Sequence, residues 1–343
     1  MRTIPPGVAP GLLILGAALS LCACGPLADT RAPAPDLRPP LVQSVQSIGP
    51  GELRVTFDEE ATLRPQKTSV TPSLAIQGMS ATGSSVVIQA SPQVPGQRYV
   101  LETEAADARG NTSDFLADFY GYNGKVPRLL INEFTPRGSG THPDCTELKA
   151  LSDGNIGGVV LYNGSPGSFD ARLIFPSCPV RAGSFLVVHW KPAGAPGEVD
   201  ETTDPAASTG YDCVDTALDF WARDSTGLGG NNGVLMLLDR PGGACLDGVL
   251  YSNRTTESDE RYRGFGSDAM LARAEELVGA GGWVIAGKKV TPEDCVSPEG
   301  TTGTRTLCRS PGAPDTNSAA DWHVVPTKKA SVGAENSAEV YVP

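Results

Sequence analysis

The sequence predicts an all-β protein made of two successive β-sandwiches, the second of which carries one short helical insertion. Two observations predict this class. Short segments rich in Val, Ile and Leu recur about every dozen residues, and clusters of turn-forming residues separate them. The chain also has 40 Gly and 29 Pro among 343 residues, which favours short strands and tight turns over long helices. We expect one sandwich over residues 41–122 and a larger one over residues 127–343.

The N-terminus has the features of an export signal. Arg2 supplies a positive charge, and residues 11–21 (GLLILGAALSL) form an apolar run. That run is too short to cross a bilayer as a mature helix, and its length suits the hydrophobic region of a signal peptide. Residues 1–23 are therefore predicted to be a signal peptide.

Residues 21–25 (LCACG) resemble the lipobox of bacterial lipoproteins, in which a Leu and then a small residue precede the modified cysteine. The resemblance implies cleavage after Ala23 and acylation of Cys24. Cys22 fits less well, because Leu21 would then stand where the small residue is needed. Two or more acyl chains hold a protein stably in a membrane. The expected partner of this end of the chain is therefore a membrane.

Residues 24–40 are rich in Pro and Ala and cannot bury enough apolar surface to fold alone. They are predicted to form an extended tether, at about 3.1 Å per residue where the backbone is polyproline II. Gly25, and not Asp, follows Cys24. In lipoproteins of bacteria with two membranes, this implies release to the outer membrane, with the leaflet left open.

The first sandwich is expected to use five short strands, which are residues 41–48, 52–57, 73–77, 85–90 and 98–105. Residues 53–58 (LRVTFD), 95–101 (PGQRYVL) and 107–111 (DARGN) resemble bacterial Ig-like domains of the surface-layer type. Tyr99 is expected to face the core. Asp107 and Asn111 suggest either a calcium site or, as the simpler interpretation, side-chain caps of a tight turn.

The second sandwich is expected to use the strands 128–134, 146–151, 158–163, 171–175, 184–190, 233–239 and 247–252. One helix is predicted near residues 267–279. Ser267 and Asp268 suit its N-terminus, Gly279 suits its end, and apolar residues recur between them at helical spacing. Its apolar face is expected to pack on the sandwich.

This second unit resembles the lamin-tail domains of exported bacterial proteins. The resemblance rests on residues 130–134 (LINEF), 146–148 (TEL), 233–239 (GVLMLLD), 247–251 (DGVLY), 315–322 (DTNSAADW) and 333–336 (GAEN). They occur in the family's order, and they imply an Ig-like β-sandwich. The chain departs from the family where Lys149 and Ala150 replace an Asn, and where Val332 replaces a Pro. The helix is also an addition.

Six cysteines lie after residue 140 and none lies in residues 25–140. An even number in an exported chain predicts three disulfides, although six cysteines allow 15 connectivities. We expect Cys295–Cys308, because it closes a short loop, and then Cys145–Cys178 and Cys213–Cys245. No CxxC pair or neighbouring His has zinc-ligand spacing, so the sequence predicts no metal site and no cofactor.

The sequence has no recognised catalytic motif, such as GxSxG, HExxH or a P-loop. Of the three histidines, His189 and His323 are expected to be packed residues, whereas His142 lies in a loop. Glu133 and Glu147 lie on neighbouring predicted strands, and paired acids of this kind can hydrolyse glycosides. In lamin-tail domains the corresponding residues appear in structural positions, so a structural role is favoured here. We therefore expect no enzyme.

The net charge of −12 argues against a nucleic-acid partner, because phosphate binding needs concentrated Lys and Arg. The predicted function is that of a lipid-anchored envelope protein, whose sandwiches bind a protein or glycan or serve a structural role. Two alternatives stay open. In the first, the chain is an accessory subunit of a separate exported enzyme. In the second, it is a polysaccharide-active hydrolase that uses Glu133 and Glu147.

Overall fold

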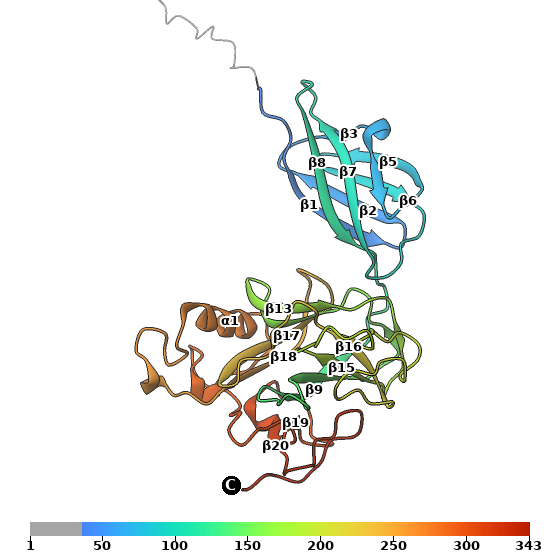
Figure 1. The fold of residues 1–343 in the computed structure, drawn as a ribbon. Helices are drawn as coiled ribbons and strands as arrows, with labels where there is room; N and C mark the ends of the chain where they lie inside the picture. Colours follow the sequence, from blue (N-terminus) through green and yellow to red (C-terminus); the bar gives the residue numbers. More distant parts are fainter. Residues whose placement is uncertain (1–35) are drawn as a thin grey trace, which may run out of the picture. The chain divides into compact units, whose positions relative to one another are not determined.

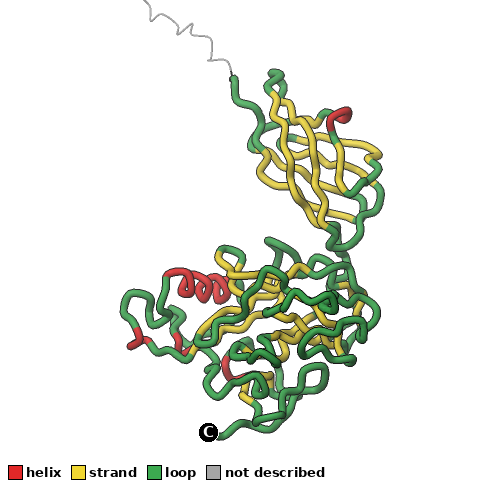
Figure 2. The backbone as a smooth tube through the Cα atoms, in the orientation of Figure 1, coloured by secondary structure: helices red, strands yellow, loops and turns green. Residues whose placement is uncertain are grey.

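The computed structural model describes residues 36–343. The signal peptide, Ala23 and Cys24 lie outside the described residues. The prediction of an all-β protein is confirmed: the described part contains 20 strands and a single α-helix (Figures 1 and 2). Within it, no helix has the length and apolar character needed to span a membrane.

Strands in residues 42–120 form two sheets. The first has the order β1-β2-β6-β5 and is antiparallel throughout. Its strands are β1 (Val42–Gly49), β2 (Glu52–Phe57), β5 (Ile76–Thr82) and β6 (Ser85–Ala90). In the second sheet, β7 pairs with β3, β4 and β8. These strands are β3 (Thr62–Leu63), β4 (Ser69–Thr71), β7 (Arg98–Ala106) and β8 (Thr112–Tyr120), and the short 3-10 helix η1 (Pro65–Lys67) lies between β3 and β4.

The core of this first sandwich is mainly apolar. Val55, Phe57, Ile88 and Leu101 are almost fully buried between the two sheets. Tyr99 is also buried, as predicted, and stacks on Phe119 with 5.2 Å between ring centroids. The strand β8 was missed in the sequence, because its alternation of exposed and half-buried residues includes two acids.

The second sandwich begins with a six-stranded sheet of order β16-β15-β10-β9-β19-β20. All of its pairs are antiparallel except β15 with β16, which run parallel. The strands are β9 (Leu129–Thr135), β10 (Cys145–Ala150), β15 (Phe185–His189), β16 (Ala217–Trp221), β19 (Leu307–Arg309) and β20 (Trp322–Val324). The last strand at each edge, β16 and β20, was not predicted.

The other layer is a four-stranded antiparallel sheet of order β13-β12-β17-β18. It consists of β12 (Val160–Ser165), β13 (Ser168–Ile174), β17 (Asn232–Leu238) and β18 (Cys245–Ser252), and a separate pair joins β11 (Gly154–Asn155) to β14 (Pro179–Val180). One continuous apolar core lies between the layers, with Ile131, Leu148, Trp190, Leu235 and Leu250 at its centre. Three short 3-10 helices lie in the loops: η2 (Thr256–Ser258), η3 (Pro292–Asp294) and η4 (Ala319–Asp321).

The predicted helix is present as α1 (Asp268–Gly279). The side chain of Ser267 accepts a hydrogen bond from the backbone N–H of Met270, which satisfies one of the free donors of the first turn. Its buried residues Met270, Ala274 and Leu277 pack on the four-stranded sheet (Figure 1). The prediction that its apolar face packs on the sandwich is confirmed.

Candidate functional site

The six-stranded sheet has a second face, opposite the core, that carries several buried ionisable groups. Alternation along the strands places Glu133, Glu147, His189 and Asp219 on this face. All four side chains are buried, because residues from the loop after β15 and from the C-terminal segment 325–343 cover them. We call this surface the covered face.

Glu133 and Glu147 are direct cross-strand partners on β9 and β10, and both are 0% exposed. Glu133 accepts hydrogen bonds from the backbone N–H and the hydroxyl of Ser331, and from the hydroxyl of Thr306. Glu147 accepts from the backbone N–H of Gly333 at 2.5 Å. The two carboxyl groups therefore fasten the C-terminal segment to the sheet.

A β-bulge explains how Asn132 joins this arrangement. The register moves from Glu147↔Glu133 to Leu148↔Ile131, so Asn132 is an extra residue that has no cross-strand partner. Its amide nitrogen donates to Glu147 Oε1 at 2.6 Å and to Asn336 Oδ1 at 2.8 Å. The bulge turns the Asn132 side chain toward the C-terminal segment.

Burial dominates the electrostatics of the acid pair. It raises the pKa of Glu147 to about 8 and raises the pKa of Glu133 as well, against the lowering effect of the hydrogen bonds. A raised pKa is typical of a general acid, but a catalytic acid must also reach its substrate. These carboxyl oxygens contact the protein's own C-terminal segment instead.

Arg309 is the centre of a second buried network, at the other side of β9. Its guanidinium contacts both carboxylate oxygens of Asp247 at 3.0 Å and also pairs with Asp315 and Asp321. Asp321 in turn accepts from the backbone N–H groups of Thr316 and Ser318, as expected for an acid that fixes a turn.

Trp322 fills the core beside this network, as predicted. It packs edge-on against Phe134, with 5.5 Å between ring centroids, and lies under the Arg309 guanidinium at 4.8 Å. Burial raises the pKa of Asp247 to about 6, although Arg309 acts in the opposite direction. Packing and turn formation therefore account for the motif residues Asp321 and Trp322.

An open cavity of about 550 Å³ lies next to both networks. Arg128 and Lys149 contribute positive charge to its lining, whereas Glu335 and Asp315 contribute negative charge. Lys149 is already paired with Glu335 at 2.6 Å. Neither Glu133 nor Glu147 lines this cavity. It offers mixed charge and apolar surface to a small ligand, without a catalytic pair.

The histidines occupy three different environments. His142 is half-exposed, and its Nδ1 lies 2.7 Å from Asp212 Oδ1. His189 is buried, and its Nε2 lies 2.6 Å from Asp219 Oδ1. His323 Nε2 lies 2.9 Å from the backbone oxygen of Ser337 in the C-terminal segment. The expectation that His189 is a packed residue is confirmed, since its ring stacks on Trp221 at 4.2 Å.

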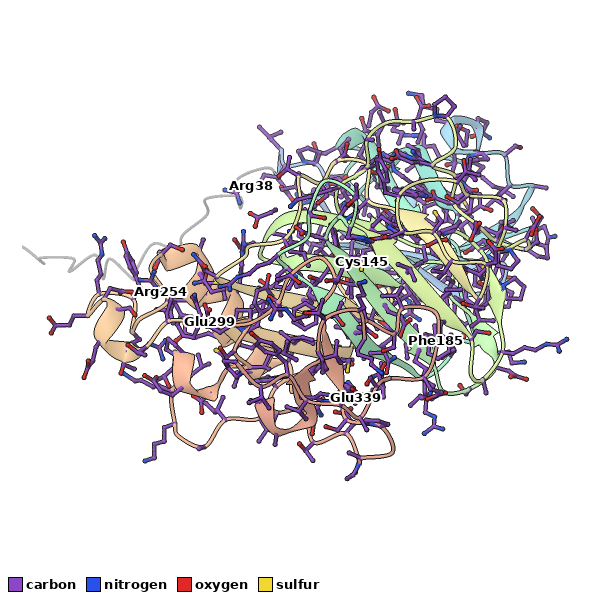
Figure 3. All side chains as sticks on the ribbon, turned by 60° about the horizontal axis from the view of Figure 1, so that its bottom comes forward. Arg38, Cys145, Phe185, Arg254, Glu299 and Glu339 are labelled. Atoms are coloured by element: carbon purple, nitrogen blue, oxygen red, sulfur yellow. The ribbon has the colours of Figure 1, made fainter. Side chains whose placement is uncertain are left out.

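The six cysteines of the described region are all free thiols, and Cys145 is labelled in Figure 3. None of the three predicted disulfides is present in the described region, and the pairings stay predictions.

Burial raises the pKa of the thiols of Cys178, Cys213 and Cys245 to about 11, and raises those of the others further. Five of the six sulfur atoms have a nearby polar partner: Thr202 O for Cys178, Ser208 Oγ for Cys213, Asp247 O for Cys245, Thr291 O for Cys295 and His323 Nε2 for Cys308.

The turn at residues 107–111 bears on the calcium alternative. Asp107 Oδ1 accepts from the backbone N–H groups of Arg109 and Asn111, each at 2.8 Å, and Oδ2 accepts from the Asn111 side chain. These are the hydrogen bonds expected of a turn cap, which was the favoured interpretation.

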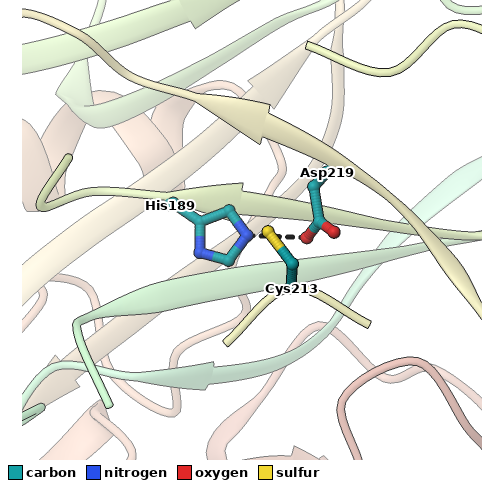
Figure 4. A group of neighbouring side chains, drawn as sticks. All are labelled: His189, Cys213 and Asp219. Atoms are coloured by element: carbon teal, nitrogen blue, oxygen red, sulfur yellow. Dashed lines mark hydrogen bonds and ion pairs between the residues drawn. The ribbon is translucent and has the colours of Figure 1, made fainter. Parts of the chain in front are cut away.

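Sequence reasoning missed one cluster on the covered face. His189, Cys213 and Asp219 each offer a ligand-type atom, and these atoms lie within 4.8 Å of one another (Figure 4). The residues are far from any recognised ligand spacing in the sequence. A signal was nevertheless present, because His189 and Asp219 both lie in strongly apolar segments, where a buried ionisable residue needs a partner.

The fold and this covered face define an all-β protein whose larger sandwich is closed by polar contacts to its own C-terminal segment. A family model described as "TP_1001_2nd: protein second domain" matches residues 127–324, more than half of the chain. The chain therefore belongs to this family. The match covers most of the larger sandwich and none of the smaller one.

One curated relative is an uncharacterized protein of Treponema pallidum (strain Nichols), which is 28% identical over 158 residues. The alignment covers 46% of this chain and 40% of the relative. The chain thus spans less than half the length of that protein.

Solved structures offer only slight similarity. The N-terminal part of the bacterial S-layer protein SbsC has a TM-score of 0.25 at 18% identity, over 37% of this chain and 35% of that one. Dimeric latent PorU from Porphyromonas gingivalis has a TM-score of 0.17 at 10% identity, over 63% of this chain and 20% of that one. Neither bears on function.

Proposed function

We propose that this chain is an exported, lipid-anchored protein of the bacterial cell envelope, most simply of the outer membrane. Its second sandwich acts as a non-catalytic binding or structural module of the lamin-tail type. The signal-peptide features of residues 1–23 and the lipobox resemblance at Cys24 support the export and the anchor, and the Pro-rich residues 24–40 suit a tether. A protein or a glycan is the expected ligand.

One observation carries the non-catalytic part of the proposal. The acid pair Glu133 and Glu147 is 0% exposed, and Ser331 and Gly333 occupy its hydrogen-bonding positions. A glycosidase needs its two carboxyl groups on either side of a substrate bond. Here the C-terminal segment takes the place that a sugar would need.

Metabolic labelling tests the anchor. A diderm bacterium expresses the full chain while it grows on a fatty-acid analogue. Wild-type protein should take up the label and fractionate with outer membranes. The Cys24→Ala variant should lose the label, whereas Cys22→Ala should keep it. Label that persists in Cys24→Ala would overturn the assignment of this residue.

The module is tested by comparing turnover with stability. Purified full-length protein should hydrolyse neither glycans, peptides nor nucleic acids, with or without divalent metal. Glu147→Gln should alter the melting temperature, and like the wild-type protein it should show no hydrolysis. A reproducible glycosidase rate that Glu147→Gln abolishes, at unchanged melting temperature, would promote the hydrolase alternative.

The open cavity is the preferred place for a ligand, since Arg128 and Lys149 line it. A panel of cell-wall and capsular glycans provides the probe. A glycan that binds wild-type protein should bind Arg128→Glu at least about tenfold more weakly, a loss of about 1.4 kcal/mol. The matched control Arg181→Glu, an exposed site outside the cavity, should bind normally. Equal binding by both variants would place the ligand elsewhere.

A further inference from the structure

The cluster of His189, Cys213 and Asp219 brings three segments together on the covered face. His189 is the last residue of β15, Asp219 is the central residue of its parallel neighbour β16, and Cys213 lies in the loop that precedes β16. Figure 4 shows the Cys213 sulfur beside the line that joins His189 Nε2 to Asp219 Oδ1. A thiol, an imidazole and a carboxylate therefore point toward one place.

The charges around this place are unbalanced. Asp219 is fully buried, and Glu201, also buried, accepts hydrogen bonds from the backbone N–H groups of Asp219 and Ser208. In the part of the chain that the structure describes, no Lys or Arg forms an ion pair with either carboxyl group. His189 is the one basic side chain within ion-pair distance of Asp219 there, and its Nδ1 is buried without any hydrogen-bond partner. A buried group of acids with so little positive charge favours a bound cation.

We propose that His189, Cys213 and Asp219 form a structural zinc site. Thiolate and imidazole ligands select Zn²⁺ over Ca²⁺ or Mg²⁺, which prefer oxygen ligands. A zinc dication cancels the charges of one thiolate and one carboxylate. The sequence predicted no metal site because these ligands lie at positions 189, 213 and 219, without the short paired spacing of a zinc ribbon.

Neighbouring residues restrict the positions of these ligands. Trp221 stacks on the His189 ring with an interplanar angle of 15° and so sets the direction of its nitrogens. Glu201 links the two ligand-bearing segments through its bonds to Asp219 N and Ser208 N. Such contacts behind the ligands orient them and strengthen metal binding.

Tetrahedral zinc needs a fourth ligand. The nearest candidate is the hydroxyl of Ser208, which lies 3.2 Å from the Cys213 sulfur and 3.1 Å from Trp221 Nε1 and donates to the backbone oxygen of Gly197. Zinc bonds of about 2.0–2.3 Å place neighbouring ligand atoms about 3.3–3.8 Å apart. The 2.6 Å separation of His189 Nε2 and Asp219 Oδ1 must therefore widen by roughly 1 Å when the ion enters.

The ion would have a structural role. His189 and Asp219 are fully buried, and the open cavity does not include them, so no substrate reaches the metal. Cys213 is only partly buried, which provides the route of entry. Binding replaces the thiol proton, which is released to water, and fastens the loop around Cys213 to the edge of the sheet.

The metal content of the full-length protein, purified in detergent without chelator, tests this proposal. Mass spectrometry should find about one zinc ion per chain. Cys213→Ser and His189→Gln should each lower the zinc content at least about tenfold. The matched control Cys178→Ser replaces another buried cysteine, which has no His or Asp beside its sulfur, and should keep the zinc.

A second measurement uses only the wild-type chain, in case a variant fails to fold. Replacing zinc by Co²⁺ should produce the thiolate-to-cobalt charge-transfer band and a tetrahedral visible spectrum. Chelation should lower the melting temperature, and zinc should restore it. Wild-type protein that binds neither ion would overturn the proposal. So would peptide mapping that finds Cys213 in a disulfide, because the sulfur cannot serve both purposes.

Discussion

The two sandwiches of this chain differ in how many ionisable side chains they bury. The smaller one buries an apolar core, and its one buried carboxylate, Glu104, pairs with Arg64 and Lys67 at the surface. The larger one buries an apolar core of the same kind and adds many ionisable groups, among them Glu133, Glu147, Asp219, Asp247 and Arg309.

The number of buried ionisable groups follows from the length of the segments that each sheet must hold in place. The strands of the smaller sandwich are joined by short turns, and hydrophobic burial suffices. The larger sandwich must also keep long irregular segments on its covered face, and their backbone N–H groups need acceptors. Buried carboxylates supply those acceptors, at the cost of their own desolvation. The larger sandwich should therefore respond to pH and to single polar substitutions far more than the smaller one.

Arg309→Ala should have the largest effect. It leaves the fully buried Asp247 without its bidentate partner, and breaking a buried pair costs about 3–5 kcal/mol. All four Trp residues lie after residue 189, so Trp fluorescence in a denaturant titration reports on the larger sandwich alone. Hydrogen exchange of residues 42–120 reports on the smaller one and should be unchanged.

The control for this experiment is Arg98→Ala. Arg98 pairs with Asp118 on the exposed side of the smaller sandwich, and solvent-exposed pairs contribute little to stability. If Arg309→Ala were as mild as Arg98→Ala, the Arg309 network would not be the contact that holds the larger sandwich together.

The acid pair predicts a pH dependence of intermediate size. The folded-state pKa of Glu147, at about 8, lies above its ordinary value of 4.5. The unfolded state therefore loses this proton first as pH rises, and folding becomes less favourable. The contribution of Glu147 to stability is fully present below pH 4.5 and is lost as pH rises to about 8, by a few kcal/mol in order of magnitude. The melting temperature read by Trp fluorescence should fall across this range.

Glu147→Gln tests the origin of that pH dependence, because the amide does not titrate. The variant should flatten the curve above pH 6. Asp247, whose pKa is raised to about 6, contributes in the same direction below that pH and should keep the lower part of the slope. An unchanged slope in Glu147→Gln would show that other groups control the stability of the larger sandwich.

The longer apolar strands of both sandwiches could be predicted because apolar periodicity and turn residues are local signals, whereas short or edge strands such as β8, β16, β19 and β20 could not. The covered face could not, because its contacts join residues such as Glu133 and Ser331, nearly 200 positions apart. The motif LINEF indicated that Asn132 and Glu133 matter, but the bulge that separates their roles depends on the register with β10. The edge strand β16 was missed since its partner is parallel and its sequence is short. His189, Cys213 and Asp219 meet only once that strand is in place.

The smallest effect is predicted at the start of α1, and it tests whether the added helix is part of the larger sandwich. Ser267→Ala removes the acceptor for Met270 N–H and should lower the stability reported by Trp fluorescence by about 1 kcal/mol. Ser267→Gly should cost only a few tenths of a kcal/mol, because a glycine at this position has no side chain and leaves the free N–H groups open to water. Met270, Ala274 and Leu277 belong to the main apolar core, so the loss should appear in the single transition of that core. A separate, earlier transition in hydrogen exchange of residues 268–279 would mean that the helix unfolds on its own and contributes little to the sandwich beneath it.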